Sequence, residues 1–333
     1  MFRKHSWLYL GLLIPLITLS GCGQTAFQIE LVPTNRQLQE TQIQRDAGLF
    51  VSDKIAIIDV DGLLANRHKS GWMRSGENPV SLFIEKLDKA AADKSVKAVV
   101  LRLDSPGGTV AASDIMHHHL MEFRRQTGKP VIACVLGIGC SGAYYIACGC
   151  DGIIAQPSGV VGNIGVIFQT FSVAGTLEKI GVKTVTIKSG DLKDMASPLH
   201  DLSDEEHKVL QGIIEHLSGQ FFEVVRKGRK TIDEQKMAEL SDGRVFTAEQ
   251  ALQQGLIDKV GYMADGIKWA KEIAGVKKTR VVIYHRPSNY KPNAYGLATA
   301  GAEGPGPLVN LELPDWLNAP GAQFLYLWQP AVD

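Results

Sequence analysis

The sequence predicts an α/β fold in which a mostly parallel sheet is flanked by helices. Short β-branched segments such as KIAIIDVDG (54–62) and VKAVVLRLDS (96–105) are bounded by turn residues, as buried strands commonly are. Between them NPVSLFIEKLDKAAAD (78–93) has helical spacing, with Asn78 as its N-cap and Pro79 in its first turn. Such an alternation of strand and helix is typical of parallel strands joined by crossover helices.

The same alternation continues along the chain. A helix is predicted over 109–128, a strand over 130–138, and a helix of small residues after Ser141. Further elements are predicted downstream: strands over 152–156, 164–170, 183–189 and 279–286, and helices over 172–181, 201–229 and 246–275. The helix over 201–229 opens with Ser203 two residues before an acidic pair, which is a typical N-terminal signal.

Length and composition bound the class of protein. At 333 residues the chain holds one large domain or two ordinary ones, and its 45% apolar content is normal for a globular protein. The formal charge is zero and no basic stripe stands out, so no nucleic-acid partner is expected. Five cysteines are too few for a disulfide scaffold at this length.

The N-terminus has the features of a secretory signal in the required order. A basic segment (MFRKH, 1–5) precedes an apolar run, WLYLGLLIPLITLS (7–20), that contains a proline and is too short to span a bilayer. The run ends in LSGC (19–22), which resembles the lipobox of bacterial lipoproteins, where the cysteine thiol is acylated. We therefore expect a lipoprotein signal peptide over 1–22, lipidation at Cys22, and a membrane-anchored protein on the periplasmic side. The alternatives are a plain signal peptide and an uncleaved anchor.

Composition also divides the rest of the chain. Residues 23–52 are polar and weakly periodic, and we interpret them as a tether to a folded domain over 53–286. Residues 287–333 are rich in proline and glycine and form a C-terminal tail. The tail includes a late apolar patch, AQFLYLWQP (322–330), and is either disordered or docked on a neighbour.

Two stretches contain candidates for the chemistry of acyl transfer. In DSPGGTV (104–110), consecutive glycines leave backbone N–H groups unobstructed, and such groups at a helix start can stabilise an oxyanion. In GCSGAYYIACGC (139–150), Ser141 follows a strand and precedes a helix, where a nucleophile can be exposed, and the Gly142 N–H can serve as a second donor. Ala143 breaks the G-x-S-x-G pattern of the α/β-hydrolases. The alternatives are an ordinary tight turn and a helix cap.

A nucleophilic serine needs a base. The run of three histidines over 117–119 directs its side chains in different directions, which suits neither a triad nor a metal site. In KSGDLKDMASP (188–198) a lysine can serve instead if burial lowers its pKa by about 3 units, which corresponds to about 4 kcal/mol. Lys193 lies among small residues and could turn inward, and Lys188 is its competitor.

In this order and spacing DSPGG, SGAYYIA, GVVGNIGV (159–166) and KSGDLKD resemble the signal peptide peptidase A family. The likeness runs from about Lys54 to Gly275 and includes GRVFTAEQALQQGLIDKVG (243–261). Members are bacterial serine peptidases with a Ser–Lys dyad on a ClpP/crotonase-like fold. The resemblance implies that 53–286 is a peptidase domain without metal or cofactor.

The resemblance also implies roles for individual residues. Ser141 would be the nucleophile, Lys193 the general base, and Gly108 and Gly142 the oxyanion donors. Where the family has a serine that orients the lysine, this chain has Asn163, whose amide oxygen can still accept from the ammonium.

The sequence departs from the family in a second place, next to the candidate nucleophile. The family has Ser-Gly-Gly where this chain has Ser-Gly-Ala, ending at Ala143. Four cysteines crowd the same region. Cys148 and Cys150 face different ways on a predicted helix, so they are poor metal or disulfide partners for each other, and Cys140 is interpreted as a small buried residue. The four are Cys134, Cys140, Cys148 and Cys150.

For function, the resemblance implies hydrolysis of cleaved signal peptides or other extended hydrophobic peptides at the membrane. Single-core members assemble into rings, so a homo-oligomer is expected. Two alternatives remain. One is a binding or scaffolding lipoprotein that kept the fold and lost activity through Asn163, and the other is a crotonase-like acyl-CoA enzyme, whose chemistry fits poorly outside the cytoplasm.

Overall fold

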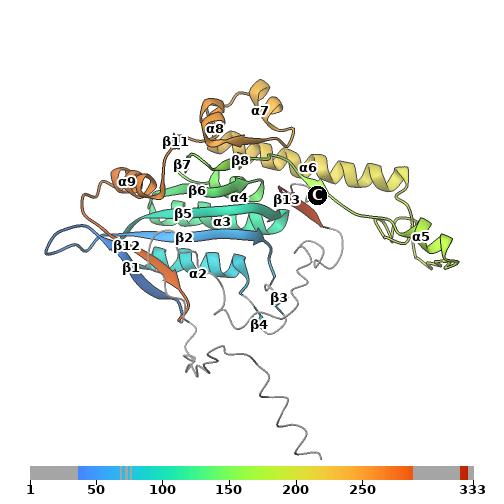
Figure 1. The fold of residues 1–333 in the computed structure, drawn as a ribbon, viewed down its shortest axis with the longest axis horizontal. Coiled ribbons are helices and arrows are strands. Elements are labelled where there is room, and N and C mark those ends of the chain that lie inside the picture. The colour runs from blue at the N-terminus through green and yellow to red at the C-terminus, as the bar shows by residue number, and fades with distance from the viewer. Residues whose placement is uncertain (1–36, 68–69, 72–73, 76, 288–322, 329–333) are drawn as a thin grey trace, which may run out of the picture. The chain divides into compact units, whose positions relative to one another are not determined.

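The computed structural model describes residues 37–67, 70–71, 74–75, 77–287 and 323–328. Its main sheet contains eleven strands within these ranges, seven of them in the order β1-β12-β2-β5-β6-β7-β11 (Figure 1). These seven are β1 (Gln39–Arg45), β2 (Lys54–Leu64), β5 (Val96–Thr109), β6 (Val131–Cys140), β7 (Gly152–Ala155), β11 (Lys259–Val260) and β12 (Arg280–His285). All neighbours along this path are parallel except β1 and β12, so the predicted mostly parallel sheet is confirmed.

Four shorter strands leave this path, and a separate hairpin follows β2 in the chain. The four strands are β8 (Val160–Gly162), β9 (Ile167–Phe168), β10 (Val245–Thr247) and β13 (Phe324–Leu327). The hairpin consists of β3 (Ser70–Gly71) and β4 (Arg74–Ser75). The described helices are α2 (Pro79–Ala92), α3 (Val110–Thr127), α4 (Gly142–Ala147), α5 (Ala174–Lys179), α6 (Asp204–Gly228), α7 (Glu234–Leu240), α8 (Ala248–Gln254) and α9 (Met263–Ile273). No described helix is long and apolar enough to cross a bilayer.

Helices cover both faces of the sheet, as a parallel sheet requires. On one face the main hydrophobic core includes Phe83 of α2, Leu120 of α3 and Tyr144 of α4, all essentially inaccessible to solvent. On the other face a second core forms around α9, whose Ile267 and Ala270 pack on the sheet. Because β5 and β6 lie between these layers, most of their residues are buried and none is exposed.

Two predicted helix starts are confirmed by their caps. The Asn78 side chain accepts hydrogen bonds from the backbone N–H groups of Val80 and Ser81, and Pro79 occupies the first helical position of α2. At the start of α6, Ser203 and Glu206 form a reciprocal capping box, which satisfies two backbone donors that the helix itself leaves unpaired.

The structure differs from the sequence prediction around DSPGGTV. The predicted turn over 104–108 is the continuation of β5, which stays extended to Thr109 because it pairs with β2 on one side and β13 on the other. The helix therefore begins only at Val110, with the Thr109 hydroxyl accepting from the N–H of Ala112.

Three other segments also differ from their predictions. The predicted tether over 23–52 includes β1, which pairs antiparallel with β12 and forms the edge of the sheet. The residues of β1 are mostly exposed and gave no strand pattern. The predicted strand over 183–189 does not form, because no strand lies beside it and side chains such as Ile187 are exposed. The tail over 287–333 includes β13, whereas Cys22 and residues 1–36 lie outside the described part of the chain.

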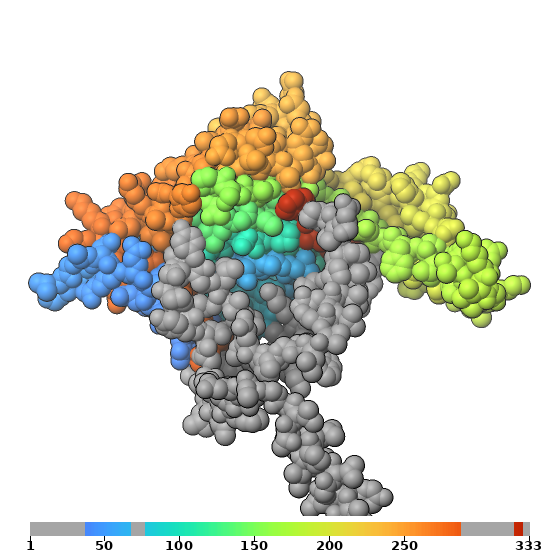
Figure 2. All heavy atoms as spheres, in the orientation of Figure 1, coloured from blue at the N-terminus to red at the C-terminus, as the bar shows by residue number. Residues whose placement is uncertain are grey.

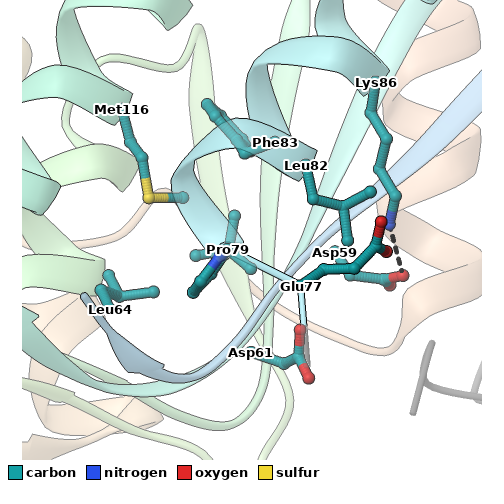
Figure 3. A pocket seen from close by; sticks show the side chains of 10 residues that line it. Asp59, Asp61, Leu64, Glu77, Pro79, Leu82, Phe83, Lys86 and Met116 are labelled. Carbon is teal, nitrogen blue, oxygen red and sulfur yellow. Dashed lines mark hydrogen bonds and ion pairs between the residues drawn. The ribbon is translucent and has the colours of Figure 1, made fainter. Parts of the chain in front are cut away.

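A buried ion cluster lies between β2 and α2. The Asp59 carboxylate accepts from Arg102 Nε at 2.6 Å and from Lys86 Nζ at 3.2 Å, and all three side chains are at most 5% exposed. Figure 3 shows the carboxylate and the Lys86 ammonium beside a small pocket that Glu77 and Met116 also line. A buried charge is tolerated only when it is paired, so Asp59 holds both cations in place.

We expect Asp59→Asn to lower the free energy of unfolding by about 3 kcal/mol or more, because it removes the charge shared by two buried cations. Urea denaturation followed by circular dichroism measures this change. Asp88→Asn, on the exposed side of α2, is the matched control and is expected to change stability by less than about 0.5 kcal/mol. Equal stabilities of the two variants would contradict this account.

Candidate active site

Ser141 lies where β6 ends and α4 begins. Its backbone has φ 51° and ψ −116°, a conformation that non-glycine residues rarely adopt. Two hydrogen bonds fix this turn: the Ser141 N–H donates to the Gly162 carbonyl at 2.8 Å, and its carbonyl accepts from the Tyr145 N–H at 2.8 Å. Strain of this kind is concentrated at functional sites, where the surrounding structure enforces it.

The Ser141 hydroxyl has no hydrogen-bond partner among the described residues, although the side chain is fully buried. Leaving a buried hydroxyl unpaired costs about 1–3 kcal/mol. A serine that only stabilised the fold would be expected to satisfy this group. The unsatisfied hydroxyl and the strained backbone therefore mark Ser141 as a candidate nucleophile.

The glycine-containing end of β5 lies beside Ser141. Gly107 has φ 103°, and a Cβ at this position would lie 2.7 Å from the backbone nitrogen of Gly142. A Cβ on Gly108 would lie 1.9 Å from the Leu64 carbonyl oxygen, so only glycine fits there. The Ser105 hydroxyl secures this end of β5, because it donates to the Gly62 carbonyl and accepts from the Gly107 N–H. Two glycine segments that are far apart in sequence thus meet beside the serine.

Ala143, the departure from the family pattern, belongs to the main hydrophobic core and is fully buried. The next residue, Tyr144, is also fully buried and donates its hydroxyl to the Leu256 carbonyl at 2.8 Å. The start of α4 is therefore held rigidly, and the extra methyl group is accommodated by core packing.

Lys193 lies in the segment after α5 and is exposed. No hydrogen bond or ion pair of its ammonium group is found among the described residues. Figure 1 shows the segment around α5 well apart from α4, the helix that begins directly after Ser141. The structure of one chain therefore does not bring the predicted nucleophile and the predicted base together.

The competing lysine has a different environment. Lys188 donates to the Asp194 carboxylate and to the Asp191 carbonyl, each at 2.7 Å. The hydrogen bond with Asp194 raises the pKa of Lys188 above its usual value, so this amine stays protonated. Of the two lysines in the motif, only Lys193 is left as a base.

Asn163 has φ 52° and is tied to the loop before β10. Its side-chain amide donates to the Gly243 carbonyl at 2.6 Å, and its backbone N–H donates to the Arg244 carbonyl at 2.8 Å. The described residues contain no hydrogen bond between Asn163 and Lys193. The orienting role of Asn163 stays a prediction.

The cysteines near the site are structural. Burial raises the pKa of the Cys134, Cys140 and Cys148 thiols to about 12 and also raises that of Cys150. All four are free, and thiols with such pKa values are poor nucleophiles and poor metal ligands.

One group of potential metal ligands occurs in the described part of the chain. Ligand atoms of Asp194, His200 and Glu206 lie within 4.8 Å of one another. Glu206 is already engaged in the capping box of α6, and Asp194 is paired with Lys188. Both carboxylates therefore have a structural explanation.

One component of the site, strand β13, was not predicted from the sequence. Strand β13, from the predicted tail, pairs antiparallel with β5 over Gly107 to Thr109 and with β9. Its Tyr326 is fully buried. The apolar residues FLYL (324–327) were the only sequence signal for this strand, and they did not indicate which part of the sheet it would join.

A strained serine at a strand-to-helix turn, beside the glycine-containing end of the neighbouring parallel strand, is the arrangement expected of a serine hydrolase on an α/β fold. The model of the family "Peptidase family S49" matches residues 123–277. This chain belongs to that family, is a serine peptidase acting on peptides, and has the ClpP-like fold expected from the resemblance.

Relatives from several bacteria support the assignment. The predicted signal peptide peptidase SppA of Enterococcus faecium is 35% identical over 231 residues, which cover 69% of this chain and 67% of the relative. A predicted protease of Synechocystis is 38% identical over 228 residues, or 68% of this chain and 77% of the relative. Protease 4 of Haemophilus influenzae is 31% identical over 234 residues, covering 70% of this chain and 37% of the relative.

Proposed function

We propose that this peptidase uses a Ser141–Lys193 dyad to hydrolyse extended hydrophobic peptides, including cleaved signal peptides, at a membrane outside the cytoplasm. The observation that carries the proposal is the strained, fully buried Ser141, whose hydroxyl has no partner and lies at the meeting point of two glycine segments. The relative named signal peptide peptidase supports the substrate class.

In the proposed mechanism the Ser141 hydroxyl attacks the peptide carbonyl while the neutral amine of Lys193 takes its proton. The N–H groups of Gly108 and Gly142 stabilise the oxyanion that forms. The lysine then passes the proton to the leaving amine, and water hydrolyses the acyl-enzyme. A lysine suits this role only when it is desolvated, because its amine must be uncharged.

Within one chain Lys193 is solvated, and we infer that a second copy completes the site. The segment that contains Lys193 exposes an unusual number of large apolar side chains, and α5 has no buried residue at all. The exposed apolar residues of this segment are Phe171, Ile180, Val182, Val185, Ile187 and Leu199. Ile187 is 98% exposed and Val185 84%. Apolar patches of this kind mark protein contacts.

Contact with a neighbouring copy would bury this apolar segment and the Lys193 amine together. In a ring each copy would lend its lysine to the next, which repeats one heterologous contact until the ring closes. This supports the predicted homo-oligomer and provides the desolvation that the base requires.

Location at a membrane depends on the N-terminal segment. The basic residues, apolar run and LSGC motif support lipidation at Cys22 on the periplasmic side. A tethered peptidase would meet hydrophobic peptides where they leave the bilayer.

A fluorophosphonate probe tests the proposal directly. We expect a covalent adduct at Ser141 in the intact protein, identified by peptide mass spectrometry, and loss of the adduct in Ser141→Ala. Ser158→Ala, in the exposed turn after β7, is the matched control and should be labelled like the wild type. Absence of labelling in protein shown by circular dichroism to be folded would overturn the proposal in favour of a scaffolding protein.

A further inference from the structure

The loop between β1 and β2, residues 46–53, presents two adjacent apolar side chains to solvent. Leu49 is 90% exposed and Phe50 is 97% exposed. In Figure 1 the loop projects beyond the ends of β1 and β2, and Figure 2 shows it as the blue tip at the left margin. Single apolar side chains on a surface are ordinary, whereas two neighbours at the end of a projecting loop indicate a surface with a partner.

The base of this loop is anchored on the segment that leads into β12. The Asp46 N–H donates to the Thr279 carbonyl at 3.0 Å, and the Arg280 N–H donates to the Asp53 carbonyl at 2.8 Å. Val51, directly after the exposed pair, is buried. The apolar pair is therefore presented by a loop that is fixed at both ends.

Basic side chains surround the base of the tip. The Lys278 ammonium lies 3.3 Å from the position that a Cβ on Gly48 would take. The Arg45 guanidinium donates to the carbonyls of Gly48 and Leu49, each at 3.4 Å, so its charge has no carboxylate beside it in these contacts. Lys277 and Lys278 are both exposed, and neither forms an ion pair among the described residues.

The acidic residues of the same two segments, 45–53 and 276–280, are matched to lysines from elsewhere. Asp46 forms an ion pair with Lys271 at 2.6 Å, and Asp53 lies 3.8 Å from Lys97. The cations named above therefore remain in excess around the exposed apolar pair. Apolar side chains next to uncompensated basic groups are the combination that binds the interface of an anionic bilayer.

The size of the tip favours lipid over a protein partner. A specific protein interface buries about 800 Å² on each side and requires a complementary surface. Two side chains on a narrow projecting loop offer much less area, whereas insertion into a bilayer needs no complementary shape.

The place of the loop in the chain is compatible with the predicted lipid anchor. Residues 23–38 separate Cys22 from β1, and a stretch of this length spans at most about 55 Å when extended. The 7 residues of β1 then lead to the loop over about 24 Å. An acylated Cys22 and the tip are therefore within reach of one bilayer.

We propose that Leu49 and Phe50 insert into the interfacial region of an anionic phospholipid bilayer, while Arg45, Lys277 and Lys278 bind the lipid headgroups. The inference rests on the membrane location in the proposed function, and it adds a second contact with the bilayer besides the lipid anchor.

This contact orients the peptidase. The loop lies at the end of the sheet where β2 and β5 begin, since Lys54 pairs with Val96, whereas Ser141 follows the end of β6. The 14 residues of β5 span about 45 Å between these two ends. The candidate active site therefore faces away from the bilayer, and a peptide has to leave the lipid before it reaches Ser141.

Photolabelling from within the lipid tests the proposal in the full-length protein. The protein is reconstituted into vesicles of phosphatidylcholine and phosphatidylglycerol that contain a phospholipid with a diazirine in the upper part of its acyl chain. Trypsin cuts after Arg45 and Lys54, so mass spectrometry recovers the loop as one peptide, residues 46–54. We expect label in this peptide and none in the peptide that contains Ser141.

Variants separate the apolar and the charged parts of the contact. Leu49→Gln combined with Phe50→Gln is expected to reduce labelling of the loop by about tenfold or more, because the apolar surface that enters the lipid is lost. Lys277→Gln and Lys278→Gln are each expected to reduce it by about fivefold in vesicles with phosphatidylglycerol, and not in pure phosphatidylcholine. Leu252→Gln, at an exposed apolar position of α8, is the matched control and should be labelled like the wild type.

The variants of the tip should unfold at the wild-type temperature, because their side chains are exposed in the folded protein. They should also hydrolyse a soluble peptide at the wild-type rate, since the loop is far from Ser141. Labelling confined to peptides N-terminal to Arg45 would overturn the inference and leave the membrane location standing.

Two further outcomes would also overturn the inference. If the tip of the wild type stays unlabelled and the double glutamine variant forms a smaller oligomer, the loop is a contact between copies of this chain. If no peptide is labelled, the proposed membrane location is overturned as well, whereas the fluorophosphonate adduct at Ser141 still tests the peptidase itself.

Discussion

Replacing Ser141 with alanine is expected to abolish peptide hydrolysis, with a decrease in kcat of at least about 10⁴-fold. The alanine lacks the attacking oxygen, and no second hydroxyl of the described residues lies in the same strained turn. Hydrolysis of a fluorogenic hydrophobic peptide measures the loss.

The same substitution is expected to leave stability unchanged or slightly raised. The Ser141 hydroxyl makes no hydrogen bond, so removing it takes away an unsatisfied buried group and no stabilising contact. Thermal unfolding checks this directly. A variant that kept more than about a tenth of wild-type activity, or one that was strongly destabilised, would show that Ser141 is a structural residue.

Lys193→Ala is expected to reduce kcat by about 10³-fold or more, because the attacking hydroxyl loses its base. Lys183→Ala is the matched control, since it removes an exposed lysine from the same segment and should leave the rate unchanged. Both variants are measured with the same peptide as Ser141→Ala.

Mixing the two inactive variants distinguishes a shared site from a site within one chain. A copy with Ser141→Ala still offers its lysine, and a copy with Lys193→Ala still offers its serine. If neighbouring copies share the dyad, co-expression should restore activity at about a quarter of the sites of a randomly mixed assembly. If the mixture stays as inactive as its components while the oligomer forms, the lysine does not come from a neighbour.

Local chemistry in the sequence was sufficient for most of the fold. The β-branched runs of β2 and β5 predicted buried strands, and the caps at Asn78 and Ser203 predicted the helix starts, because these signals involve residues close together in the chain. Strands formed by long-range pairing were less predictable: β1 is polar, and β13 gives no sign in its sequence of the edge it joins.

By itself the sequence determined which residue types could carry out acyl transfer and in what order they occur: a serine after a strand, glycines at a neighbouring strand end, and a lysine in a later loop. Only the tertiary structure decided how they are arranged. The strain at Ser141 and the contact of Gly107 with the Gly142 segment arise from neighbouring parallel strands that end side by side. The pairing of Lys188 with Asp194, the exposure of Lys193 and the position of Tyr326 depend on contacts between distant parts of the chain, which no local pattern encodes.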